Sequence, residues 1–269
     1  MAMKLTTGKR IAETSSKGNQ EKWRESGRWY KLDLFGCEGL AETVASRLLE
    51  HTNLGELGFS FVPYRMEQLE VHGCKRTGCS SPDFLQEGEA ILTLAELFRK
   101  GAGPDWQAQV SRLPNLASRV RWMADTTRQL TGLDRFGEYL TALFEADMLF
   151  GNEDRHLNNI AVLRRGGAFA YCPFFDFGAG LLSNTRDFPL DIVPKALVGQ
   201  LRAQPLGTLF ARQVHAAQGE FGPQLRWDFT ETHIAALEEA LPYYAQRDRG
   251  LLRDRVEWCL KVQQRKLLS

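Results

Sequence analysis

Residues 151–159 read Gly-Asn-Glu-Asp-Arg-His-Leu-Asn-Asn, and the triplet Asp176-Phe177-Gly178 follows them along the chain. Three side chains in these segments form a set that phosphoryl transfer needs. One carboxylate orients the acceptor hydroxyl, while an amide and a second carboxylate hold Mg²⁺ on the nucleotide phosphates. The order D-x-x-x-x-N before D-F-G matches that of protein kinases. It predicts Asp154 as the catalytic carboxylate and Asn159 and Asp176 as the Mg²⁺ ligands.

Each of these residues also has an ordinary structural interpretation. Alone, Asp154 would be a turn aspartate with a local hydrogen bond, and Asn159 an amide that caps a loop. Only the spacing selects Asn159 over its neighbour Asn158. His156 is a catalytic candidate by residue type, although a histidine that positions the loop through a hydrogen bond is the commoner role. Both interpretations of His156 stay open.

The overall composition is that of a soluble globular protein. The chain has 269 residues, 43% hydrophobic and 25% charged, which suits one two-lobed domain or two small ones. The net charge of +1 creates no strong field, so we expect no direct binding to nucleic acid or membrane. There is no apolar run long enough to span a bilayer and no apolar signal core. The five cysteines form no even framework, so we expect reduced thiols and a cytoplasmic protein.

Hydrophobic periodicity predicts a small, strand-rich N-terminal lobe. Residues 29–32 and 59–64 are typical of strands, and residues 68–71 of a weaker one, whereas residues 36–50 repeat apolar side chains at helical spacing. Residues 72–88 contain three glycines and a proline, which indicates a loop at the boundary between lobes. We therefore expect one lobe at residues 1–86 and a second at 87–269.

The second lobe has the pattern of a mainly helical domain. A hairpin at residues 160–171 separates the catalytic loop from Asp176. The predicted fold class is α+β: a two-lobed, protein-kinase-like fold with the ATP cleft between the lobes. We expect helices at residues 90–100, 113–131 (broken) and 136–150, and at least two more within 230–268, the first capped by Thr230.

Lys31 is the only lysine on the strand that precedes the first predicted helix. A kinase needs an ammonium group there, for the α- and β-phosphates of ATP. Glu42 is the candidate for the helix-borne glutamate that holds this lysine. Glu38, one helical turn earlier, is the alternative.

A turn-like segment with one glycine precedes that strand, at Gly18-Asn19-Gln20. It matches neither a P-loop nor G-x-G-x-x-G. Its backbone amides are nevertheless candidates to hold phosphate groups, so Gly18, Asn19 and Gln20 are candidate nucleotide-binding residues.

Four segments together resemble those of HipA-like serine/threonine kinases, the kinase toxins of bacterial toxin–antitoxin pairs, and of compact cell-translocating kinases of similar type. Residues 15–22, Ser-Ser-Lys-Gly-Asn-Gln-Glu-Lys, resemble the family's S-x-x-G-x-Q-x-K loop, and Lys31 stands where the ATP lysine is expected. Residues 149–159 resemble its catalytic loop, G-N-x-D-R-H-x-x-N, and residues 175–178 resemble its metal motif.

The resemblance implies a fold related to phosphoinositide kinases, with ATP and Mg²⁺ as cofactors and a Ser/Thr acceptor on a protein. It also implies autophosphorylation in the glycine loop at Ser15, where a phosphate of roughly −2 charge would repel those of ATP. An antitoxin-like partner is implied too, although the chain is much shorter than the full-length toxin and its extra N-terminal subdomain is not recognisable. The adenine-binding residues are expected near 67–72, where the lobes join.

Other functions remain open. A lipid or small-molecule kinase fits the same catalytic loop, although the low net charge argues against work at an anionic membrane. A catalytically silent nucleotide-binding regulator belongs to another class, but all three catalytic positions are filled. A DNA-associated regulator that acts through a partner is weaker still, since no basic stripe or DNA-reading motif is present. Asp154→Ala separates an enzyme from a pure binder.

Overall fold

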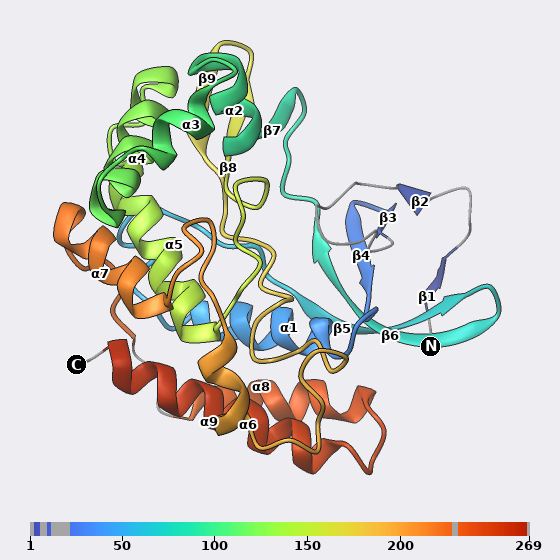
Figure 1. Ribbon diagram of the computed structural model, residues 1–269. Coiled ribbons are helices and arrows are strands. Elements are labelled where there is room, and N and C mark those ends of the chain that lie inside the picture. Colours follow the sequence, from blue (N-terminus) through green and yellow to red (C-terminus); the bar gives the residue numbers. More distant parts are fainter. Residues whose placement is uncertain (1–2, 6–9, 12–21, 228–230, 268–269) are drawn as a thin grey trace.

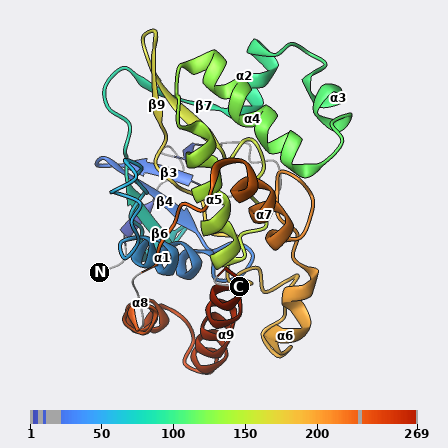
Figure 2. The ribbon, with the colours of Figure 1, turned by 90° about the vertical axis from the view of Figure 1, so that its left-hand side faces the viewer.

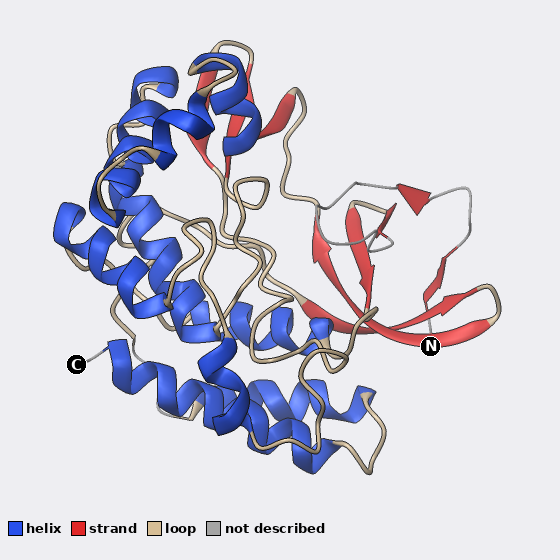
Figure 3. Cartoon of the chain, in the orientation of Figure 1, coloured by secondary structure: helices blue, strands red, loops and turns tan. Residues whose placement is uncertain are grey.

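The structure is a computed structural model that describes residues 3–5, 10–11, 22–227 and 231–267. It has the two parts expected from the sequence, a strand-rich N-terminal part and a larger, mainly helical part (Figures 1 and 3). The α+β fold class is thus confirmed. The chain passes from the first part to the second through residues 83–88.

A six-stranded sheet forms the core of the N-terminal part. β1 runs parallel to β5, and the other neighbours are antiparallel. From edge to edge the strands are β1 (Met3–Leu5), β5 (Arg65–Val71), β6 (Cys74–Pro82), β4 (Arg28–Leu32), β3 (Lys22–Glu25) and β2 (Arg10–Ile11).

The expectation of a loop across residues 72–88 is wrong, because β6 is a central strand paired with both β4 and β5. Its glycine, Gly78, marks a close approach between strands rather than a turn. A Cβ at this position would lie 2.1 Å from the carbonyl oxygen of Lys31. The glycine thus lets β6 pack against the strand that carries the predicted ATP lysine.

The prediction of a strand at residues 59–64 is also wrong. This segment makes only an isolated bridge, between Phe61 and Phe174. Its backbone bonds run from Val62 N to Phe174 O and from Phe174 N to Ser60 O, each at 2.8 Å. The segment has the apolar composition of a strand because Phe59, Val62 and Tyr64 are buried, and it supports the chain just before Asp176.

The first predicted helix is confirmed as α1 (Glu38–Leu49). Its apolar stripe, Leu40, Val44 and Leu48, is fully buried. The helix lies between the sheet and α8 (Thr232–Ala240) near the bottom of Figure 1. The C-terminal helices thereby reach back to the N-terminal part and hold α1 in place.

A second, three-stranded sheet consists of β7 (Glu89–Thr93), β8 (Ala161–Arg165) and β9 (Ala168–Tyr171). The β8–β9 hairpin confirms the one expected from the sequence. The helix expected from residue 90 begins later, as α2 (Leu94–Gly101), because residues 89–93 pair with β8. The Thr93 hydroxyl accepts a hydrogen bond from Glu96 N at 3.2 Å and caps the helix.

The remaining helices enclose α5 (Phe136–Phe150), which is buried along almost its whole length and ends, as predicted, at Gly151 with φ +62°. Figure 2 shows α5 crossing the centre of the helical part. The region at residues 113–131, which was expected to be broken, contains one continuous helix, α4 (Leu116–Thr131). The predicted helix cap, Thr230, lies outside the described residues. The other elements are α3 (Trp106–Ser111), α4 (Leu116–Thr131), α6 (Pro194–Leu197), α7 (Phe210–Phe221) and α9 (Arg249–Leu267), with 3-10 turns at Val198–Gln200 and Leu241–Tyr243.

Two general expectations concern membranes and disulfides. Among the residues that the structure describes, no helix is long and apolar enough to cross a membrane. All five cysteines are free thiols, as the sequence predicted.

Candidate active site

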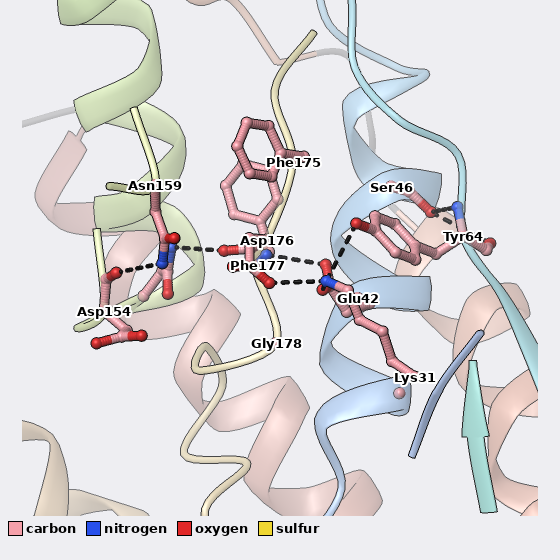
Figure 4. A network of polar contacts seen from close by, with 12 residues as sticks. Lys31, Glu42, Ser46, Tyr64, Asp154, Asn159, Phe175, Asp176, Phe177 and Gly178 are labelled. Atoms are coloured by element: carbon pink, nitrogen blue, oxygen red, sulfur yellow. Dashed lines mark hydrogen bonds and ion pairs between the residues drawn. The ribbon is translucent and has the colours of Figure 1, made fainter. Parts of the chain in front are cut away.

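Lys31, Glu42 and Asp176 meet between the two parts of the molecule (Figure 4). Lys31 Nζ donates to Glu42 Oε1 at 2.8 Å and to Asp176 Oδ1 at 2.7 Å. The Tyr64 hydroxyl lies 3.3 Å from the same nitrogen. The lysine comes from β4, the glutamate from α1 and the aspartate from the loop after β9, so the contact fixes three elements relative to one another.

Glu42 also orients the segment that carries Asp176. Its second oxygen, Oε2, accepts a hydrogen bond from the backbone N–H of Phe177 at 2.8 Å. The alternative glutamate, Glu38, accepts instead from the N–H groups of Phe35 and Gly36, at 2.6 and 3.0 Å. Glu38 therefore closes the turn before α1, and Glu42 is the residue that contacts Lys31.

The charge states of these groups follow from burial and proximity. Burial alone would lower the pKa of Lys31, but the carboxylates of Asp176 and Glu42 outweigh it and hold that pKa well above its usual value. Burial disfavours the ionised form of Asp176, yet the Lys31 ammonium group holds the pKa of Asp176 well below its usual value. Burial raises the pKa of Glu42. The site thus contains an ammonium group and an ionised Asp176 carboxylate.

A buried ion pair connects the predicted catalytic loop, residues 151–159, to α5. Arg155 Nε contacts both carboxylate oxygens of Asp147, at 3.1 and 3.0 Å, and both side chains are almost completely buried. Arg155 Nη1 donates to the carbonyls of Asn159, at 2.9 Å, and Phe175, at 2.6 Å. Asn152 Nδ2 donates to Asp147 Oδ1 at 2.8 Å and to the Asp176 carbonyl at 3.3 Å. This network fixes the backbone on both sides of the hairpin, at the predicted catalytic and metal motifs.

The sequence motifs assigned no role to Arg155 or to Asp147. The available signal was a charged residue, Asp147, within the strongly apolar helix that spans 136–150. A buried carboxylate needs a partner, and the only arginine of the catalytic loop was the nearest candidate.

Asp154 and Asn159 lie on the other side of Asp176 from Lys31 (Figure 4). Asn159 Nδ2 donates to the Asp154 carbonyl at 2.9 Å, so its amide oxygen is the atom left for a metal ion. His156 Nε2 lies 3.7 Å from Asp154 Oδ2. Neither ring nitrogen of His156 hydrogen-bonds within the described part of the chain. The loop-positioning hydrogen bond expected of His156 is therefore absent there.

A cleft of about 450 Å³ opens beside these residues, and Asp154, Asn159 and Asp176 all line it. Asp176 has a left-handed backbone with φ +65°, a conformation that non-glycine residues adopt chiefly where the surroundings enforce it. The segment after Gly178 also lines the cleft, through Ser183, Asn184, Arg186 and Asp187.

The oxygen atoms present suit Mg²⁺. Asn159 offers an amide oxygen and Asp176 a carboxylate, and Mg²⁺ takes few protein ligands when phosphates supply the rest. In the described residues no cluster of three or more His, Cys, Asp or Glu side chains is arranged to hold a metal ion. A nucleotide-dependent site with two protein ligands does not require such a cluster.

Comparisons with known proteins identify the fold. No family model matches the sequence, and no curated protein matches it. Among solved structures, the chain is similar to the Helicobacter pylori proinflammatory kinase CtkA, with 14% identity, a TM-score of 0.64, and coverage of 100% of this chain and 99% of that one. The chain has a kinase fold.

A second similar structure is HipA of Shewanella oneidensis MR-1, from a toxin–antitoxin complex with HipB and operator DNA. It shares 14% identity at a TM-score of 0.45, over 97% of this chain and 66% of that one. The similarity to CtkA confirms the sequence-based resemblance at the level of the fold.

In this kinase fold, one premise of the expected adenine site is wrong, namely that the two parts join near residues 67–72. Residues 67–72 belong to β5 and its turn into β6, and do not join the two parts. The joining segment is 83–88. There Phe84 and Leu85 pack with Phe175 against a buried cluster that includes Leu163 of β8. The predicted nucleotide-binding residues Ser15, Gly18, Asn19 and Gln20 lie outside the described residues.

Proposed function

We propose that the protein is an ATP- and Mg²⁺-dependent kinase of the HipA-like type that phosphorylates serine or threonine on a protein. One observation carries the proposal. Asp176, which Lys31 contacts, lines one cleft together with Asp154 and Asn159, and these side chains are of the types that phosphoryl transfer uses. Positioning and charge neutralisation are the main contributions of such a site to catalysis.

Each residue has a distinct role in this proposal. Asp154 accepts and orients the proton of the acceptor hydroxyl. Lys31 binds the α- and β-phosphates, and Glu42 keeps its ammonium group in place. Asn159 and Asp176 hold Mg²⁺, which when bound neutralises charge on the phosphates. His156 is the remaining catalytic candidate by residue type, with its Nε2 3.7 Å from Asp154 Oδ2.

The adenine ring is proposed to lie against the segment 83–88. The ring centroids of Phe84 and Phe175 are 6.3 Å apart, and the neighbouring buried side chains are apolar. A flat, mostly apolar purine fits such a surface, with backbone groups of the segment available for hydrogen bonds.

The remaining expectations belong to the same proposal. They are action in the cytoplasm, autophosphorylation at Ser15, an antitoxin-like partner and no direct contact with nucleic acid. A kinase for lipids or small molecules, or a silent nucleotide-binding regulator, would be the outcome if no protein is labelled.

The test is incubation of the purified protein with Mg²⁺ and γ-labelled ATP, followed by phosphosite mapping. Asp154→Asn and Asp176→Asn should each abolish labelling, whereas the exposed Asp105→Asn serves as the matched control and should keep it. Label on serine or threonine with this pattern supports the proposal. Label that survives both substitutions contradicts it, and a nucleotide-dependent rise in Tm without any label would indicate a silent binder.

A further inference from the structure

Arg255 on α9 is one of the largest completely buried side chains in the described part of the protein. Its guanidinium group donates to three backbone carbonyls, those of Leu182 at 3.0 Å, Phe188 at 2.6 Å and Pro189 at 2.5 Å. These carbonyls mark the two ends of one segment, residues 182–189. A single side chain from the last helix thus spans the whole segment.

Burial of the Arg255 guanidinium group costs free energy, because the charge loses its contact with water. Among the described residues, its hydrogen-bond partners are carbonyl groups rather than a carboxylate, and burial lowers the pKa of Arg255. The Asp191 carboxylate offsets only part of the effect of burial on the pKa of Arg255. A buried charge whose hydrogen-bond partners are all neutral is stable only where several hydrogen bonds compensate for lost water. The backbone carbonyls of Leu182, Phe188 and Pro189 supply those hydrogen bonds.

The segment itself needs outside support. Leu181 and Leu182 both have φ +55°, a left-handed conformation that is strained for a leucine and persists only where the surroundings enforce it. The Leu182 carbonyl is one of the groups that Arg255 holds. On the other side, the Ser183 carbonyl accepts from Cys37 N at 3.0 Å, which ties the segment to the start of α1.

The segment also forms a wall of the cleft. Ser183, Asn184, Arg186 and Asp187 lie between the two points that Arg255 fixes, and all four line the cleft together with Asp154. Lys31 and the segment 83–88, which are proposed above to contact the nucleotide, are not among the residues that line this cleft. Movement of the wall would therefore change the space for the acceptor more than the space for the nucleotide.

We propose that Arg255 is a positioning residue for the acceptor substrate, which acts by holding residues 182–189 as the acceptor wall of the cleft. The acceptor role rests on the proposed kinase function. The positioning of the segment does not, and it has a readout of its own.

The kinetic test compares Arg255→Met and Arg255→Lys with the native protein, with Arg253→Met on the same helix as the control. The probes are ATP and dephosphorylated casein. We expect Arg255→Met to raise the KM for casein about tenfold, equivalent to one lost hydrogen bond to a charged group, and to change the KM for ATP less than about twofold. Arg255→Lys keeps the charge and should restore part of the loss. A parallel rise in both KM values, or no rise for casein, would overturn the acceptor role.

Amide hydrogen exchange gives the activity-independent readout. In Arg255→Met, and to a smaller degree in Arg255→Lys, exchange should quicken in residues 181–189 while residues 152–159 stay protected as in the native protein. If Arg255→Met does not fold, Arg255→Lys provides both measurements. Unchanged exchange in 181–189 would overturn the positioning of the segment. Faster exchange in a protein that labels no acceptor would keep the positioning and overturn the acceptor role together with the proposed function.

Discussion

Lys31 Nζ lies 2.7 Å from Asp176 Oδ1, although 145 positions separate the two residues in the chain. The contact joins a strand of the N-terminal sheet to the predicted metal motif of the helical part. Glu42 completes it from α1, within 2.8 Å of the same ammonium group. The two parts therefore meet through charged side chains, beside the proposed nucleotide site.

Removal of the lysine should destabilise the protein as well as inactivate it. Lys31→Met leaves Glu42 and Asp176 as two neighbouring carboxylates without their shared cation, and we expect a loss of about 3–5 kcal/mol in the free energy of unfolding. The double variant Lys31→Met/Glu42→Gln should lose less than the two single variants together, because it removes one of the two repelling charges. Denaturant unfolding measures all three, and Lys195→Met, at an exposed lysine, is the control. Additive losses would show that these residues are not coupled.

The second prediction concerns pH. Asp33 accepts from the Tyr244 hydroxyl at 2.7 Å and from Gly39 N at 2.6 Å, and burial raises its pKa from 3.8 to about 7, with Glu38 adding to the rise and Arg76 opposing it. Because the folded pKa exceeds the unfolded one, the contribution of Asp33 to stability is complete below about pH 4 and is lost as the pH rises toward about 7.

Asp33→Asn cannot titrate and should remove this dependence. The stability of the native protein minus that of Asp33→Asn should fall by about 1 kcal/mol per pH unit between those limits. Unfolding in denaturant at half-unit pH steps gives the difference directly. The comparison cancels the contributions of the buried carboxylates Glu42, Glu145 and Asp147, whose raised pKa values act in the same direction, whereas Glu38 interacts with Asp33 and is cancelled only in part. A difference that does not vary with pH would contradict the prediction.

The third prediction concerns the ion pair under the catalytic loop. Asp147→Asn leaves the Arg155 guanidinium group buried without its counter-charge, so we expect a loss of about 3–5 kcal/mol in the free energy of unfolding. The surface pair Asp125–Arg128 offers a matched control, since Asp125→Asn should change stability by less than about 0.5 kcal/mol. Equal effects of the two substitutions would mean that burial does not determine the strength of the pair.

The fourth prediction uses the close approach at Gly78. In Gly78→Ala the new Cβ would meet the Lys31 carbonyl at 2.1 Å, so the β4–β6 pairing must shift, at a cost of about 1–3 kcal/mol. The shift also displaces Lys31, and the affinity for ATP should fall. Gly167→Ala, where no atom lies within 4 Å of the new Cβ, should have little effect on either quantity. Thermal unfolding and ATP titration check both variants, and similar behaviour of the two would refute the steric argument.

Local patterns in the sequence predicted the elements whose signals are local. α1 and α5 carry apolar side chains at helical spacing, and the β8–β9 hairpin has a turn of two glycines, Gly166 and Gly167, between apolar strands. β6 was missed because its environment is set by its neighbours. In isolation, Gly78 is typical of a turn, and Ser80 and Ser81 are typical of surface residues. In the structure, both serines are buried between paired strands.

The candidate site likewise contains residues that local sequence patterns predicted and others that they could not predict. The motif order selected Asp154, Asn159 and Asp176, and the structure places all three on one cleft. It also brings Glu42 rather than Glu38 to Lys31. Arg255 could not be found from the sequence, because its partners are backbone carbonyls that any residue type could supply. The catalytic roles themselves stay predictions until the labelling experiment.

The hairpin between Asn159 and Asp176 also bears on the search for distant relatives. Pairing of β8 with β9, as in Val162 opposite Tyr171, brings the two ends of the hairpin together whatever the length of its tip. Insertions or deletions at Arg165–Gly167 would lengthen or shorten the exposed turn and leave the two metal-motif residues where they are. A sequence signature that fixes the number of residues between Asn159 and Asp176 would therefore reject homologous proteins that differ only in that turn, whereas one that allows a variable gap would retain them.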